Sequence, residues 1–249
     1  MPKKINSAYR IHKIISSTID QPSTAPTLGV WALALAVKES GNPRIGLKVN
    51  QRLSSVLNEL TLMKSQLQKS DFEEETYTSE IQHIELAIDP LLLNSSWNSV
   101  SQYLTPVTIK SLLLFSQSLP NEETEITSDE INELFARLSE LESFLENSTL
   151  PERLILLIIS QISLIREALY EYSIAGEKAL REAIRYAKGE YPEVEDLINE
   201  NKSKQEIQKL GEIWCKVDEL SKKAVHVNDV IELIDKGWNF ISGFLPPPS

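Results

Sequence analysis

The stretch "LPERLILLIISQISLIREALYEY", Leu150–Tyr172, decides the fold class, because it could be either a membrane span or a helix of a protein core. Every position from Leu154 to Ile159 is apolar. Only twelve uncharged residues separate Arg153 from Arg166, however, whereas a transmembrane helix needs about 20 apolar residues. The stretch is therefore too short to cross a bilayer.

The second half of this stretch has the spacing of a helix with one buried face. Just before it, Thr149 and Glu152 have the spacing of a capping box, and Pro151 suits the first turn of a helix. We therefore predict the central helix of a bundle, with its first half surrounded by protein. Its apolar stripe consists of Ile155, Ile158, Ile162, Ile165, Leu169 and Tyr172.

The rest of the chain is also typical of helices separated by short turns, because glycine is scarce and strand-like alternation is absent. We predict an all-α fold, a multi-helix bundle of about seven to nine helices with a long C-terminal amphipathic helix. Thr127 and Glu130 form a second capping-box pair. The other predicted helices are Ser7–Ile19, Thr27–Lys38, Ile45–Lys69, Ile81–Pro90, Leu91–Leu104, Val107–Leu119, Ile131–Leu145, Leu180–Ala187 with Gly189 as its C-cap, and Ile207–Leu245.

The helix at Ile45–Lys69 has a heptad seam, whose residues alternate four and three positions apart. This seam is compatible with a homomeric coiled coil. The favoured interpretation is one wall of an antiparallel bundle within the same chain. The seam residues are Val49, Leu53, Val56, Leu60, Met63 and Leu67.

Charge is distributed unevenly along the chain, whose net charge is -11. Residues 1–69 hold ten Lys or Arg and three Asp or Glu, which gives +7, so the remainder is -18. We expect this basic head to pack on its own acidic body, because its cations are spread thinly; an anionic partner is the alternative. The polar segment Pro120–Glu130 separates two predicted domains: residues 1–120, with the basic head and the heptad helix, and residues 121–249, with the central and final helices.

Known chemical motifs are missing from the sequence. It contains neither a glycine-rich phosphate loop nor a Cys/His cluster, and its pI near 4.9 does not favour nucleic-acid binding. Glu80 and His83 form one Glu-x-x-His pair, but a di-iron site needs two such pairs. We therefore predict no catalytic residue, metal site or cofactor. The single Cys215 indicates a reducing, cytoplasmic compartment.

The C-terminal segment "GWNFISGFL", Gly237–Leu245, is the densest group of aromatic residues. It either folds back to close the core or docks onto a partner or a membrane surface, since aromatic residues dominate such anchors. The candidate partner-binding residues are Trp238, Phe240, Ile241, Phe244 and Leu245.

The segment "LPERLILLIISQISLIREALYEYSIAGEKALREAI", Leu150–Ile184, resembles a segment of uncharacterised bacterial helical proteins. The shared pattern is a proline and an acid, an apolar helix, "REALYEY", a glycine and another short helix. The resemblance implies a bacterial, cytoplasmic, non-enzymatic protein, and it implies no functional residues.

The sequence thus favours a non-catalytic protein–protein interaction module, such as an adaptor, a regulator or a subunit of a larger assembly. The candidate surfaces are the heptad seam, the final helix and its aromatic end. A membrane-docked effector that uses the aromatic end and the basic head is the alternative. A carboxylate-based metal enzyme built on Glu80 and His83 ranks third.

The membrane alternative makes a prediction of its own. Binding to vesicles should require anionic lipid and should be lost on combining Trp238→Ala with Phe244→Ala, because these changes remove the aromatic anchors. Co-sedimentation with vesicles measures the binding. Lack of binding to any vesicle contradicts the membrane alternative.

Overall fold

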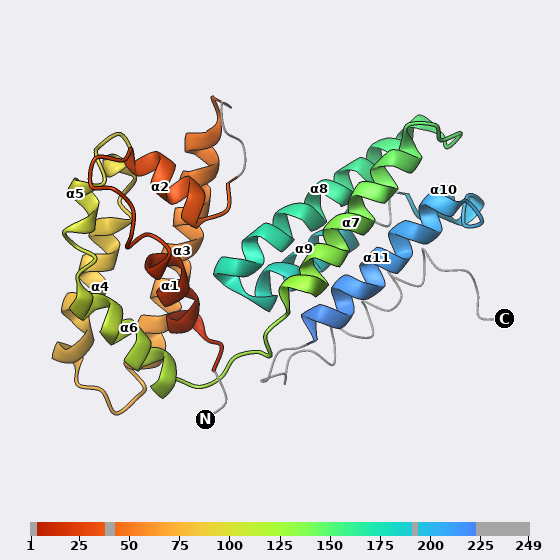
Figure 1. Cartoon of the computed structure of the whole chain (residues 1–249). Coiled ribbons are helices and arrows are strands. Elements are labelled where there is room, and N and C mark those ends of the chain that lie inside the picture. The colour runs from red at the N-terminus through yellow and green to blue at the C-terminus, as the bar shows by residue number, and fades with distance from the viewer. Residues whose placement is uncertain (1–3, 38–42, 191–193, 223–249) are drawn as a thin grey trace. The chain divides into compact units, whose positions relative to one another are not determined.

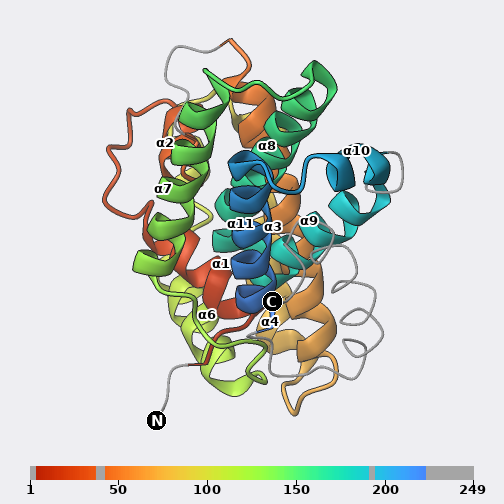
Figure 2. The same cartoon turned by 90° about the vertical axis from the view of Figure 1, so that its right-hand side faces the viewer.

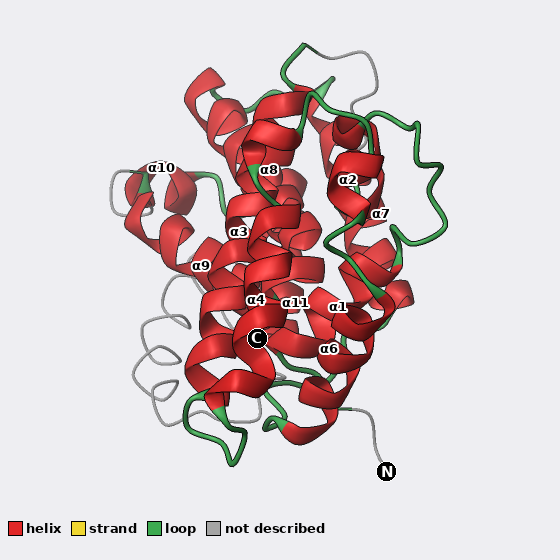
Figure 3. Ribbon diagram, turned by 90° about the vertical axis from the view of Figure 1, so that its left-hand side faces the viewer, coloured by secondary structure: helices red, strands yellow, loops and turns green. Residues whose placement is uncertain are grey.

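The computed structural model describes residues 4–37, 43–190 and 194–222, and the regular secondary structure within these ranges is helical (Figure 3). These ranges contain eleven α-helices, nine of them seven residues or longer, and no strand. This result confirms the predicted all-α, multi-helix fold. None of the helices in these ranges combines the length and the apolar character that crossing a membrane requires.

The chain divides into two compact units. The first comprises residues 1–122 and 173–175, and the second comprises residues 123–172 and 176–249. The division after residue 122 falls inside the polar segment Pro120–Glu130. Each unit has a hydrophobic core cluster of its own.

In its described residues, the first unit contains six α-helices (Figure 1). They are α1 (Ser7–Ser16), α2 (Thr27–Ala34), α3 (Ile45–Leu67), α4 (Glu74–Ala87), α5 (Asn98–Ser101) and α6 (Pro106–Ser118), with a 3-10 helix η1 (Pro90–Leu92) between α4 and α5. Helix α3 contacts α1, α2 and α4, while α6 contacts α1 and α4.

The heptad seam lies on the inner face of α3. All six of its residues are buried in the core of the first unit: Val49, Leu53, Val56, Leu60, Met63 and Leu67. The seam therefore forms a wall within this chain. It is not available as a surface for a second chain, so that part of the surface prediction is wrong.

The single helix predicted over Leu91–Leu104 is also wrong, because η1 and α5 replace it. Asparagine and serine side chains compete with helical backbone bonds, and Ser95 Oγ donates to the Leu92 carbonyl at 2.7 Å. The buried Trp97 then fixes the segment to α2, where its ring meets Trp31 edge-on with centroids 5.6 Å apart.

The second unit is built from five helices. They are α7 (Ser128–Leu145), α8 (Glu152–Ala175, of which residues 173–175 belong to the first unit), α9 (Glu177–Glu190), α10 (Glu195–Glu200) and α11 (Gln205–Ser221). Figure 2 shows α11 beside α7 and α9, which are the helices it contacts. Leu154, Ile158, Ile162 and Ile165 of α8 are buried in the same core.

The two predicted capping boxes differ in outcome. The box at α7 is confirmed: Thr127 Oγ1 accepts from Glu130 N at 3.3 Å, and Glu130 Oε2 accepts from Thr127 N at 2.9 Å. The box at α8 is wrong, because the N-cap is Pro151, which provides no side-chain bond. Thr149 lies three positions before Glu152, the first residue of the helix, and its hydroxyl accepts from Lys204 Nζ at 3.4 Å instead.

The prediction that protein surrounds the first half of α8 is wrong as well. Leu156 is 60% exposed and Ile159 is 45% exposed. Only one stripe of the apolar run, which includes Leu154 and Ile158, reaches the core. An all-apolar run of six residues therefore has one buried face and one exposed face.

Neither of two predicted helix ends is confirmed. Gly189 is not a C-cap, because α9 continues through it to Glu190. The long final helix predicted over Ile207–Leu245 is described only as α11, and its remaining part lies outside the described residues.

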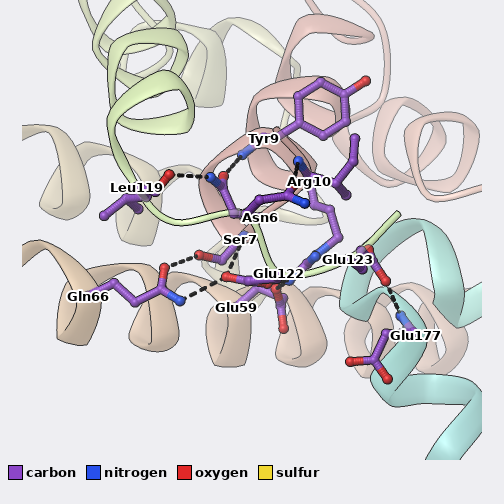
Figure 4. A network of polar contacts seen from close by, with 12 residues as sticks. Asn6, Ser7, Tyr9, Arg10, Glu59, Gln66, Leu119, Glu122, Glu123 and Glu177 are labelled. Carbon is purple, nitrogen blue, oxygen red and sulfur yellow. Dashed lines mark hydrogen bonds and ion pairs between the residues drawn. The ribbon is translucent and has the colours of Figure 1, made fainter. Parts of the chain in front are cut away.

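The one-residue turn between α8 and α9 depends on Gly176. Its backbone has φ 65° and ψ -152°, a combination that essentially only glycine adopts. The buried Glu123 carboxylate packs against the Gly176 backbone. It also accepts from Glu177 N, the first amide of α9, at 2.6 Å (Figure 4). A Cβ on residue 176 would lie 2.5 Å from Glu123 Oε1.

Gly176→Ala should therefore lower the free energy of unfolding by about 2 kcal/mol or more, through backbone strain and the clash with Glu123. Gly189→Ala is the matched control in α9: a Cβ there meets no atom within 4 Å, so the change should stabilise by about 0.5–1 kcal/mol. Urea denaturation followed by circular dichroism measures both. Equal effects of the two substitutions would contradict this role of Gly176.

Candidate functional site

An apolar groove lies between α3 and α4 of the first unit. Its volume is about 490 Å³, within the range of about 300–1,000 Å³ that is usual for ligand-binding clefts. Five of the nine residues that line it are apolar, and the full set is Leu53, Ser54, Leu57, Gln82, Glu85, Leu86, Ile88, Asp89 and Pro90.

Leu57 and Leu86 are the exposed leucines of this groove. Leu57 directly follows Val56 of the buried seam and is 44% exposed, while Leu86 lies between the buried Ile84 and Ala87 and is 45% exposed. Both positions are one step away from the core-facing stripe of their helix. The two helices therefore present leucine to solvent on either side of the same hollow.

The polar residues of the groove are acidic or neutral. Glu85 is exposed and Asp89 is half-buried, and no Lys or Arg is among the lining residues. Asp89 Oδ1 accepts from Leu91 N at 2.9 Å and so caps η1. Ser54 Oγ donates to the Asn50 carbonyl at 3.0 Å. Such a site can bind an apolar group beside a positive charge.

The groove is lined by one hydroxyl side chain and two carboxylates. The Ser54 hydroxyl is its only potential nucleophile among side chains with an O–H or S–H group, and no histidine that could act as its base lines the groove. Its lining therefore provides no Ser–His pair.

The basic head contacts acidic residues of the chain at Arg10 of α1. Arg10, which is buried, pairs with the buried Glu59 of α3 at 2.5 Å and with Glu122 at 2.6 Å (Figure 4). Glu122 also accepts from Ser7 N at 3.1 Å and from Gln66 Nε2 at 2.8 Å. A buried cation of the head is thus neutralised by carboxylates of its own unit.

The residues just before α1 extend the polar network around Arg10. Asn6 is buried and is the N-cap of α1, where its Oδ1 accepts from Tyr9 N at 3.0 Å. Its Nδ2 donates to the carbonyls of Ser116 and Pro120, at 3.0 and 3.1 Å. Lys4 Nζ donates to the Leu119 carbonyl at 3.0 Å. These bonds hold residues 4–6 against the end of α6, so this polar network has a structural role.

The Glu80–His83 pair is present, but the described residues do not extend it into a metal site. His83 Nδ1 lies 3.8 Å from Glu80 Oε2. Within the described ranges, no group of three or more His, Cys, Asp or Glu is arranged to hold a metal ion. The structure thus adds no ligand to this pair.

Burial changes the pKa values of Cys215 and His12. Burial raises the pKa of the half-buried Cys215 thiol, and Asp218 and Glu212 raise it further. This environment is the opposite of the electropositive one that activates a nucleophilic cysteine. Burial lowers the pKa of His12, whose Nε2 lies 3.4 Å from Ser16 Oγ.

The partner-binding residues predicted from sequence, Trp238, Phe240, Ile241, Phe244 and Leu245, lie outside the described residues. The α3–α4 groove, by contrast, does not follow from the sequence pattern. Its only sequence signals are Leu57 and Leu86, which fall off the apolar stripes of their helices. Isolated surface leucines are common, so such a signal does not identify a site on its own.

Comparison of the chain with protein-family models, with curated proteins and with solved structures gives no match. The resemblance of Leu150–Ile184 to uncharacterised bacterial proteins stays a prediction.

The buried Arg10–Glu59 pair makes a prediction about stability. Arg10→Met should lower the free energy of unfolding by about 3–5 kcal/mol, because Glu59 is left as an uncompensated buried charge. Combining it with Glu59→Leu should cost less than the sum of the single changes. The matched control is Arg137→Met, which removes the exposed pair with Glu133 and should cost less than about 0.5 kcal/mol. Urea denaturation measures all four variants; a strictly additive double variant contradicts the coupling.

Proposed function

We propose that the chain is a non-catalytic protein–protein interaction module, an adaptor or a subunit of a larger assembly, and that the α3–α4 groove is its docking surface. The observation that supports this proposal is the position of Leu57 and Leu86, which are both nearly half exposed at one concave site. Half-exposed leucines become fully buried when a partner covers them, and that burial favours association.

The shape of the site adds support. An exposed leucine on a flat part of the surface is common in proteins. A concave apolar site with a few polar groups at its edge is instead typical of a binding site. Ile88 and Leu53 are buried beneath the groove. A partner side chain that enters the groove would therefore contact apolar atoms on several sides. The cytoplasmic location predicted from Cys215 remains part of this proposal.

The docking role is tested by selecting peptides from a phage-displayed random library on the full-length chain. Enriched sequences are then synthesised and their affinities measured by fluorescence anisotropy. Leu57→Glu and Leu86→Glu should each weaken binding at least about tenfold, because each places a charge under the apolar surface of the peptide.

Leu114→Glu in α6 is the matched control. Leu114 is a helical leucine of the same unit, 49% exposed, and does not line the groove. This variant should bind the enriched peptides as tightly as the wild type, and melting curves should show all three variants to be folded. A library that yields no binding sequence would contradict the proposal, as would equal loss of affinity in Leu57→Glu and Leu114→Glu.

A further inference from the structure

The groove has an acidic side, which is provided by α4 and its flanks. Residues 70–109 contain seven acidic residues and no Lys or Arg. The acidic residues are Asp71, Glu73, Glu74, Glu75, Glu80, Glu85 and Asp89. Glu85 and Asp89 both line the groove, and neither forms an ion pair with another described residue. This acidic side thus has two carboxylates whose charge is not neutralised by the described part of the chain.

The arrangement of the groove residues suits an elongated ligand. Gln82, Glu85 and Leu86 lie on one face of α4, because they are spaced three or four positions apart. Asp89 follows just beyond the end of α4, as the N-cap of η1, and lines the same groove. Leu53 and Leu57 of α3 are spaced by four on the opposite wall. A trough between two helices accepts the side chains of a third helix, whose apolar anchors also recur every three or four residues.

We propose that the groove receives an amphipathic helix of a partner protein in which the apolar stripe is flanked by Lys or Arg. This inference rests on the proposed function and specifies the partner. The apolar anchors would cover Leu57 and Leu86, and the flanking cations would face Glu85 and Asp89.

Charge argues against other occupants. Nucleic acids and anionic membrane surfaces would meet the carboxylates of Glu85 and Asp89 with like charge. A second copy of this chain is disfavoured for the same reason, because its net charge is -11. A basic helix is therefore the occupant whose charge complements the groove.

The test uses three synthetic peptides of about 18 residues, long enough to form helix on binding. They share one leucine stripe, which is flanked by Lys in the first, Gln in the second and Glu in the third. Affinities for the full-length chain are measured by fluorescence anisotropy at about 50 mM and about 300 mM NaCl.

At low salt the Lys peptide should bind about three- to tenfold more tightly than the Gln peptide, as expected for two exposed ion pairs, and the Glu peptide should bind most weakly. The gap should narrow at high salt, because screening weakens exposed pairs. Glu85→Gln combined with Asp89→Asn should reduce the affinity of the Lys peptide to that of the Gln peptide. Asn at 89 keeps an acceptor for the cap of η1.

The matched control is Glu146→Gln combined with Glu212→Gln. It changes the net charge by the same amount at two exposed positions of the second unit and should leave all three affinities unchanged. An equal loss of Lys-peptide binding in this control would overturn the inference, since binding would then follow net charge.

The remaining outcomes separate this inference from the proposed function. If the three peptides bind equally and Leu57→Glu abolishes binding, the groove is a docking surface but the basic flanks are wrong. If none of the three binds, the helical occupant is wrong, and the library selection alone decides whether the groove docks any peptide. If a peptide binds Leu57→Glu as tightly as the wild type, the assigned location is wrong.

Discussion

The burial of Arg10 is the constraint on which the first unit depends. A charged guanidinium out of water is tolerated only when it is paired and hydrogen-bonded, and here Glu59 and Glu122 provide the opposite charge. These two partners come from α3 and from the segment that follows α6. One ion-pair cluster therefore fixes three parts of the chain that are distant in sequence, and it defines the position of α3, the helix that forms one wall of the groove.

Pairing within the first unit also determines which charged side chains remain available to a partner. The basic head directs cations inward: Arg10 towards carboxylates, Arg52 towards the Leu35 carbonyl and Lys4 towards the Leu119 carbonyl. The acidic residues of α4 have no cation nearby in sequence, because residues 70–109 contain none. The uneven charge of the chain is thus partly neutralised inside the first unit, while the groove keeps a negative edge.

The sequence predicts the long helices well, because their apolar periodicity reflects the burial of one face. The heptad seam of α3 and the capping box of α7 follow directly from residue spacing. Local signals fail where tertiary contacts decide instead. Trp97 fixes a segment that looks helical against α2, and Lys204 binds the Thr149 hydroxyl, which had the spacing of an N-cap. The groove could not be predicted, because it exists only once two helices have packed side by side.

Exposure alone does not separate a docking site from an ordinary surface, and α8 shows why. Leu156 is more exposed than Leu57, yet the lining of the α3–α4 groove contains neither it nor Ile159. Leu57 and Leu86 differ from them by lying on two walls of one hollow, with unneutralised carboxylates at its edge. Concavity increases the apolar contact that a partner side chain can make, and a nearby negative charge selects among partners by repelling anions. Because concavity and negative charge occur together at this site, we assign to the groove an amphipathic helix flanked by cations.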